Sequence, residues 1–130
     1  MNLKKTLIEY YSKRAKEYDE IYYRHDKIRL KEQKFIAENI TQTFKRRYVL
    51  ELACGTGFWT KYLIKSAEKV LATDYSSQML EIAAGRLSKN YNVIFMQSDA
   101  YNPPNCYPKF NAAMANFWFS HIPKIKLKKF

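Results

Sequence analysis

From residue 48 onward the chain alternates short apolar runs with helical segments, and this alternation restricts the fold more than any other feature. Segments with helical spacing, at residues 58–66 and 76–87, separate the first three apolar runs. The apolar runs themselves lie at residues 48–53, 69–73, 92–97 and 110–115. Apolar strands that alternate with helices of this length are typical of βαβ units around a parallel sheet. We therefore predict an α/β fold with a Rossmann-like, mostly parallel sheet.

Two amphipathic segments precede the first predicted strand. In the first, apolar side chains from Leu3 to Tyr22 recur at spacings of three and four residues, and the second covers residues 27–44. The length of 130 residues suits one compact domain. We predict a single domain, in which residues 1–47 form a cap of two helices and residues 48–130 form the core.

The formal net charge of +11 is concentrated in the two flanks of the chain. Residues 1–48 hold 13 basic and 7 acidic side chains, and residues 109–130 hold 5 basic and no acidic ones. The middle, residues 49–108, is neutral with 5 of each. The excess charge has two readings, which are solvated helix faces and a surface that binds a polyanion.

Several classes of protein are excluded by the remaining composition. No apolar run approaches the ~20 residues of a membrane-spanning helix, and the first ten residues lack the apolar core of a signal peptide. We therefore expect a cytoplasmic protein with no membrane partner. Cys54 and Cys106 stand outside any zinc-binding pattern, so we expect no metal.

Residues 49–60 read as a buried strand, a Gly-x-Gly turn at Gly55 and Gly57, and the start of a helix. Glycines let the backbone approach a ligand closely, and the first turn of a helix offers free N–H groups. The dinucleotide fingerprint needs a third glycine where this chain has Thr60, so a nicotinamide or flavin site is not expected. The turn remains suited to a small anionic group such as a carboxylate.

Two further carboxylates follow predicted strands. Asp74 ends the second strand, 17 residues after the second glycine of the turn, and Asp99 follows the third strand. An acid about 20 residues after such a turn often binds ribose hydroxyls. Ligands of these folds bind at the carboxyl ends of the strands, so we expect Gly55, Asp74, Asp99 and Asn116 to converge on one crevice. For Asp74 alone, a role in the turn that caps the next helix is an equal alternative.

On these motifs the chain resembles the class I S-adenosylmethionine-dependent methyltransferases, from about residue 10 to residue 130. The resemblance is carried by Leu-Glu-Leu-Ala-Cys-Gly-Thr-Gly at 50–57, Asp-Tyr-Ser-Ser-Gln-Met-Leu at 74–80 and Ser-Asp-Ala at 98–100. It implies S-adenosylmethionine as the cofactor and methyl transfer to a small-molecule acceptor. It also implies the strand order 3-2-1-4 and a chain that lacks the later strands of a seven-stranded core, so that the fourth strand is an open edge.

The resemblance also implies which residues contact the cofactor. Glu51 and the backbone of the turn would surround the methionine part, and Asp74 would bind the ribose hydroxyls. Tyr75 and Met79 would pack on the adenine, whose edge Asp99 and the Ala100 amide would contact. The complete set of expected cofactor-binding residues is Tyr11, Tyr18, Glu51, Ala53, Cys54, Gly55, Gly57, Asp74, Tyr75, Met79, Asp99, Ala100 and Asn116.

Transfer of a methyl group from a sulfonium depends on positioning, and the sequence shows no pair of nucleophile and base. A sulfonium favours aromatic faces, although core packing is the alternative for each ring and is favoured for Trp59 and Phe117. The candidate rings are Tyr11, Tyr18, Trp59, Phe117 and Trp118. His121 is a candidate for deprotonating the acceptor. The alternative, which we favour, is that His121 lies in a loop and has no chemical role. Cys54 is expected to pack as a small residue.

Other functions stay open at this point. A non-catalytic module would bind RNA through the basic flanks, or a protein through the open edge at residues 110–115, which a second copy of the chain would also cover as a homodimer. An RNA methyltransferase would need the basic flanks to form one continuous face. Asn-Pro-Pro-Asn at 102–105 does not match an Asn-Pro-Pro-Tyr-type base-methylating motif, because it lies after the third strand rather than the fourth and its last residue is not aromatic. We predict a turn there. We do not favour nucleic acid as the partner, and the sequence does not specify the acceptor.

Overall fold

The computed structural model describes residues 9–10, 13, 16, 27–104 and 109–115. The seven elements of this part are α2 (Lys27–Thr43), β1 (Tyr48–Glu51), α3 (Thr60–Ser66), β2 (Lys69–Asp74), α4 (Ser77–Leu87), β3 (Val93–Gln97) and β4 (Ala112–Met114). The described residues of the first predicted helix are helical, and the rest of that segment lies outside the described residues. None of the described helices combines the length and the apolar character that a membrane span requires.

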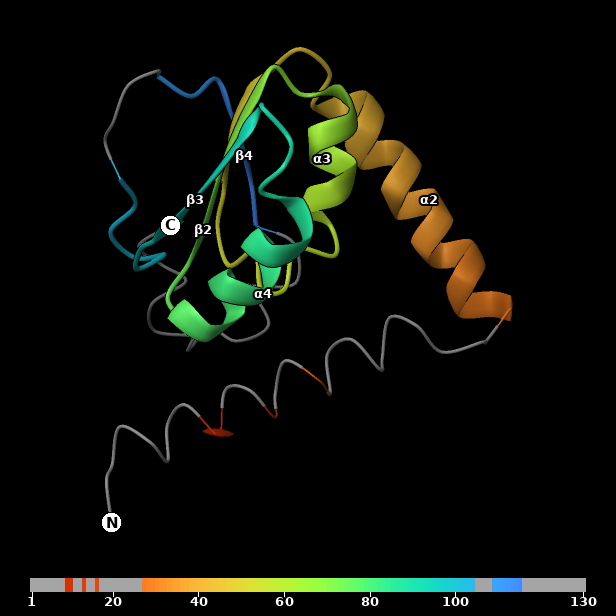
Figure 1. Ribbon diagram of the computed structural model, residues 1–130. Helices are drawn as coiled ribbons and strands as arrows, with labels where there is room; N and C mark the ends of the chain where they lie inside the picture. Colours follow the sequence, from red (N-terminus) through yellow and green to blue (C-terminus); the bar gives the residue numbers. More distant parts are fainter. Residues whose placement is uncertain (1–8, 11–12, 14–15, 17–26, 105–108, 116–130) are drawn as a thin grey trace.

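The four strands form one sheet in the order β3-β2-β1-β4, and every pair is parallel. This confirms the predicted order and the Rossmann-like α/β fold. In the register, Leu50 of β1 lies between Leu71 of β2 and Ala113 of β4. Figure 1 shows α2, α3 and α4 together on one side of the sheet. Within the described residues β4 pairs only with β1, so it is an edge strand there, as predicted.

The core lies between the sheet and these helices. Alternate residues of the central strands point into it, and Val49, Val70 and Ala72 are at most 2% exposed. Leu63 of α3 is completely buried against them. Burying such aliphatic side chains stabilises the fold by roughly 1.5–3 kcal/mol each. The apolar runs predicted as strands therefore supply the sheet side of this core.

The first strand and the following helix are shorter than predicted. The prediction extends the strand to residue 53, but β1 ends at Glu51 because the backbone of Ala53 turns into the left-handed region, with φ of 54°. Helix α3 begins at Thr60 rather than at residue 58. The residues between the two elements form the turn that the glycines predict, and this turn lies at the carboxyl end of β1.

Asn92 connects the end of α3 to the start of β3. Its side-chain amide donates hydrogen bonds to the carbonyls of Ile64 and Ala67, at 2.9 and 3.1 Å. These carbonyls lie at and just after the C-terminal end of α3, where helix carbonyls lack partners within the helix. Asn92 is 7% exposed, and its own carbonyl accepts from the amide of Val70. Residue 92, predicted as the first residue of a strand, therefore fixes the α3 end to the sheet.

Candidate functional site

The turn after β1 is held in place by backbone hydrogen bonds to the neighbouring strand. The amide of Cys54 donates to the carbonyl of Thr73 on β2 at 2.9 Å, and the amide of Gly57 donates to Cys54 at 3.1 Å. Gly55 and Gly57 have φ of 57° and 85°, a region that glycine adopts without a steric penalty. The chain therefore leaves β1, is fixed against β2, and enters α3 within a few residues.

The two glycines of the turn have different surroundings. A Cβ atom at Gly55 would meet nothing within 4 Å, so the backbone there faces open space. A Cβ atom at Gly57 would lie 2.9 Å from Cδ1 of Leu87 and 3.2 Å from Cβ of Ala83. Gly57 thus packs closely against α4 with a backbone conformation that favours glycine, while Gly55 leaves room for a ligand. Contact between Gly57 and a cofactor stays a prediction.

Asp74 ties the end of β2 to the glycine turn. Its Oδ2 accepts from the amide of Gly55 at 2.8 Å, and its Oδ1 accepts from the amide of Ser76 at 2.9 Å. Burial raises the pKa of Asp74, and hydrogen bonds from the backbone amides of Ser76, Gly55 and Tyr75 oppose that shift. The predicted convergence of Gly55 and Asp74 is confirmed. A carboxylate offers about four acceptor positions, so Asp74 retains capacity for ligand hydroxyls.

The alternative role of Asp74 in the turn is also confirmed. The bond from the Ser76 amide to Asp74 closes this turn, and Ser76 is the N-cap of α4. The hydroxyl oxygen of Ser76 accepts from the amide of Met79 at 3.2 Å. One carboxylate thus supports both the glycine turn and the start of the next helix, while the contact of Asp74 with ribose hydroxyls stays a prediction.

Glu51 is a buried acid at the carboxyl end of β1. It is 2% exposed, and its Oε1 accepts a hydrogen bond from the hydroxyl of Thr60, which is completely buried. Desolvation by burial raises the pKa of Glu51 to about 8, with a contribution from the negative charge of Asp74, and the bond from Thr60 opposes the rise. The carboxyl is therefore mostly protonated at neutral pH. A cation bound beside it would favour its ionised form.

The third acid follows β3. The amide of Ser98 donates to the carbonyl of Asp74 at 3.0 Å, which brings the end of β3 beside that of β2. Asp99 itself is exposed, its Oδ1 accepts from the amide of Tyr101 at 2.9 Å, and Ala100 is half-buried next to it. The amide of Asn102 donates to the carbonyl of Asp99, so residues 99–102 form a turn just before the one predicted at 102–105, whose last residue lies outside the described residues. Asp99 therefore joins the same edge of the sheet as Asp74.

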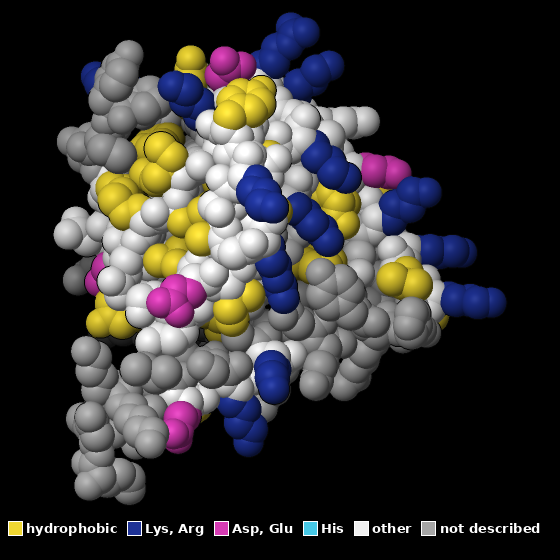
Figure 2. Space-filling model, viewed as in Figure 1, with side chains coloured by type: hydrophobic (Ala, Val, Ile, Leu, Met, Phe, Trp, Pro, Cys, Tyr) yellow, Lys and Arg dark blue, Asp and Glu magenta, His cyan; other side chains and the backbone are white. Residues whose placement is uncertain are grey.

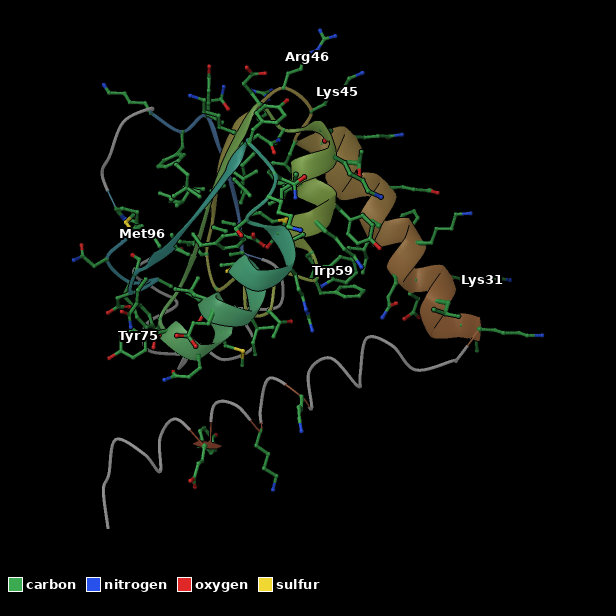
Figure 3. All side chains as sticks on the ribbon, viewed as in Figure 1. Lys31, Lys45, Arg46, Trp59, Tyr75 and Met96 are labelled. Atoms are coloured by element: carbon green, nitrogen blue, oxygen red, sulfur yellow. The ribbon has the colours of Figure 1, made fainter. Side chains whose placement is uncertain are left out.

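Tyr75 and Met79 differ in exposure, although both are expected to pack on the adenine of the cofactor. Tyr75 is 69% exposed at the sheet edge, where Figure 3 labels it, and its face is open to a ligand. Met79 is 7% exposed in the first turn of α4. Gln97 was missed by the sequence reasoning, and its side-chain amide donates to the carbonyl of Tyr75 at 2.8 Å. Gln97 is the last residue of β3, which pairs with β2, and Tyr75 directly follows β2. This shared position at the carboxyl ends of neighbouring strands could have identified Gln97.

Two predicted site residues are part of the core. Trp59 is 6% exposed and its ring centroid lies 4.8 Å from that of Phe58, which confirms the core-packing alternative for this ring. Cys54 is 8% exposed, and burial raises the pKa of its thiol, so it packs as a small residue as predicted. The predicted site residues that lie outside the described residues are Tyr11, Tyr18, Asn116, Phe117, Trp118 and His121.

Comparisons with known proteins identify the family. The model of a family described as a methyltransferase domain matches residues 49–130. This chain belongs to the methyltransferase domain family. The structure of a DhpI-SAM-HEP complex is 31% identical with a TM-score of 0.71, over 98% of this chain and 56% of that one. A DhpI-SAH complex gives 30% identity and the same TM-score, over 94% of this chain and 57% of that one.

Curated relatives match shorter stretches. A malonyl-(acyl-carrier protein) O-methyltransferase of Halalkalibacterium halodurans is 42% identical over 55 residues, which are 41% of this chain and 20% of that protein. A demethylmenaquinone methyltransferase of Clavibacter sepedonicus is 34% identical over 74 residues, which are 57% of this chain and 30% of that protein. The methyltransferase domain described above thus spans little more than half of the DhpI chain and less of these relatives.

Proposed function

We propose that this methyltransferase domain binds S-adenosylmethionine and transfers its methyl group to a small-molecule acceptor. The observation that carries the proposal is the contact between the Gly55 amide and the Asp74 carboxylate, which joins an open glycine turn to an acid at the end of β2. The similarity to the DhpI-SAM-HEP and DhpI-SAH complexes, which extends over nearly the whole chain, supports it. The relatives compared above are methyltransferases by name, so a non-catalytic module is not favoured.

The residues at the sheet edge fit such a cofactor in their chemistry. The free space at Gly55 admits the methionine part close to the backbone, and the buried carboxyl of Glu51 offers an acceptor for its ammonium group. Asp74 has acceptor positions left for the ribose hydroxyls, and the exposed ring of Tyr75 offers a face for the adenine. The cofactor, when bound, supplies an electrophilic methyl group and its own leaving group. These residues therefore orient the reactants rather than attack them.

Calorimetric titration with S-adenosylhomocysteine and S-adenosylmethionine tests the proposal. We expect binding by the chain, and at least tenfold weaker binding by Asp74→Ala because an acceptor of the ribose is lost. Glu81→Ala is the matched control, since it removes an exposed carboxylate from α4. Tyr75→Ala removes an exposed ring, so weaker binding by this variant cannot be attributed to unfolding.

Thermal unfolding of each variant separates loss of the site from loss of the fold. A folded wild-type chain that gives no heat with either compound contradicts the cofactor assignment. The same conclusion follows if Asp74→Ala and Tyr75→Ala both bind as tightly as the Glu81→Ala control.

A further inference from the structure

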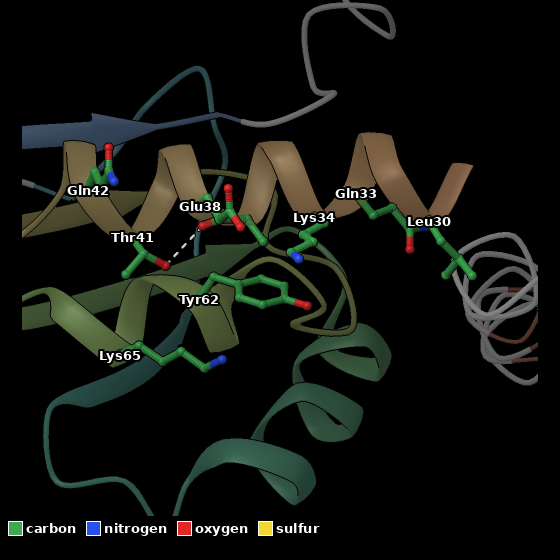
Figure 4. Close-up of a pocket in the computed structure, with 9 residues that line it drawn as sticks. Leu30, Gln33, Lys34, Glu38, Thr41, Gln42, Tyr62 and Lys65 are labelled. Atoms are coloured by element: carbon green, nitrogen blue, oxygen red, sulfur yellow. Dashed lines mark hydrogen bonds between the residues drawn. The ribbon is translucent and has the colours of Figure 1, made fainter. Parts of the chain in front are cut away.

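A groove between α2 and α3 is lined by residues that take no part in the candidate cofactor site. It has a volume of about 470 Å³, and we call it the α2–α3 groove. Lys34, Glu38 and Gln42 of α2 line one side, and Tyr62 and Lys65 of α3 line the other. Figure 4 shows Lys34 extending from α2 toward the Tyr62 ring, with Lys65 on the α3 side of that ring. An aromatic ring therefore lies between lysines from two helices.

The lysines of α3 lie close to the faces of aromatic rings. The Nζ atom of Lys61 lies 4.2 Å from the ring centroid of Phe58 and 5.1 Å from that of Tyr62. The Nζ atom of Lys65 lies 4.9 Å from the Tyr62 centroid. An ammonium within about 6 Å of a ring is attracted to its face. Two cations one helical turn apart thus lie over one aromatic cluster.

The same region carries an excess of basic over acidic side chains. Burial lowers the pKa of Lys61, and the nearby charges of Lys65 and of Arg86 on α4 lower it further. Like charges one turn apart on a helix destabilise it. Helix α2 and the turn after it, residues 27–47, contain seven Lys or Arg and two Glu. Figure 2 shows Lys and Arg side chains spread over this face with few acidic ones between them. An anionic ligand would relieve this repulsion.

We propose that the α2–α3 groove binds single-stranded nucleic acid. Lys34 and Lys65 contact phosphates on the two sides of the groove, and Tyr62 stacks on a base once the ammonium groups move from the ring onto the phosphates. Positively charged grooves with aromatic rings are the usual means of binding single strands without sequence preference. Lys34 lies on α2 and Lys65 on α3, so a single small anion would not contact both lysines, whereas a chain of phosphates would. A lipid surface fits less well, because the Tyr62 ring and the two lysines line a groove rather than a protruding face.

Fluorescence anisotropy with labelled oligo(U) and oligo(dT) tests this inference without any cofactor. We expect binding that weakens steeply between about 50 and about 200 mM KCl. Lys34→Gln/Lys65→Gln should weaken it about tenfold or more, and should reduce the slope of log K against log salt by about 1.4, at about 0.7 per phosphate contact. Lys89→Gln/Lys109→Gln changes the net charge equally at exposed lysines outside the groove, and should change the affinity by less than about threefold.

Tyr62→Leu tests the stacking contact, and we expect at least about fivefold weaker binding from the loss of one stacked base. Lys34 and Lys65 are exposed, so their glutamine variants should keep the wild-type circular dichroism spectrum and melting temperature. Tighter binding of oligo(U) than of oligo(dT) identifies RNA, and equal binding identifies single strands in general. Three results overturn the inference: no oligonucleotide binding by the folded chain, equal losses in the two double variants, or binding to phosphatidylserine vesicles alone.

Discussion

The buried carboxyl of Glu51 should make the stability of the domain depend on pH in a specific direction. The pKa of Glu51 is about 8 in the folded chain, against an ordinary value of 4.5. Below both values the group is protonated in both states and has no effect. As the pH rises through 4.5 the unfolded chain ionises while the folded chain stays protonated, so the free energy of unfolding falls. The loss levels off above pH 8, where both states are ionised.

The magnitude follows from the shift. Each unit of pKa difference corresponds to about 1.4 kcal/mol, so the cost is about 3 kcal/mol at pH 7 and about 5 kcal/mol above pH 8. Glu51→Gln keeps an oxygen that accepts from Thr60 and removes the charge. We expect this variant to be more stable than wild type at pH 7 by up to about 3 kcal/mol. At pH 4 the two proteins should be nearly equal in stability.

Urea unfolding at several pH values between 4 and 9 measures this difference. The matched control is Glu81→Gln, which removes an exposed carboxylate and should follow the wild-type curve. Asp74 also has a raised pKa, but it is present in all three proteins and largely cancels in the comparison. Parallel curves for wild type and Glu51→Gln would refute the argument that Glu51 is held protonated by burial.

Four further substitutions test the local structure by urea unfolding. Gly57→Ala should cost about 2 kcal/mol or more, because its Cβ would meet Leu87 at 2.9 Å and φ is 85°, whereas Gly55→Ala, with free space, should cost about 1 kcal/mol. Equal costs would contradict the packing role. Asn92→Ala should cost about 1–3 kcal/mol because two hydrogen bonds to carbonyls at the α3 end are lost. Ala53→Gly should stabilise by up to about 1 kcal/mol, since φ is 54° there, and a destabilised variant would argue against strain.

The order of the elements could be predicted from the sequence because it depends on local periodicity. Apolar runs and helical spacing identify βαβ units, and such units together with the resemblance lead to the order β3-β2-β1-β4. The sequence predicts the ends of the elements less accurately than their order. Nothing in the identity of Ala53 indicates a left-handed backbone, so the end of β1 was placed two residues too late.

The site shows the same division between local and long-range information. The position of Asp74 at the end of a strand was predicted from spacing, but its hydrogen bond to the Gly55 amide joins residues 19 positions apart. The close packing at Gly57 involves Leu87, 30 positions later on α4. Such contacts depend on how helices pack on the sheet, and a single sequence does not specify this packing. The raised pKa of Glu51 likewise depends on burial in the folded chain.

The electrostatics of the site lead to a last prediction, which rests on the proposed cofactor. Glu51 and Asp74 stand at the ends of adjacent strands, and both have a raised pKa. A ligand with a positive charge near them, such as the ammonium group of S-adenosylhomocysteine, would favour their ionised forms. Because Glu51 is mostly protonated at neutral pH, binding that requires its carboxylate must displace a proton.

The affinity for S-adenosylhomocysteine should therefore rise with pH while Glu51 is protonated, by up to about tenfold per pH unit, and level off above pH 8. Titrations at pH 6 to 9 measure this slope, and calorimetry in buffers of different ionisation enthalpy counts the released protons. In Glu51→Gln the pH dependence should disappear because there is no proton to release at this position. If wild type binds with the same affinity across this range, the cofactor does not interact with an ionised Glu51, even though the cofactor assignment itself would stand.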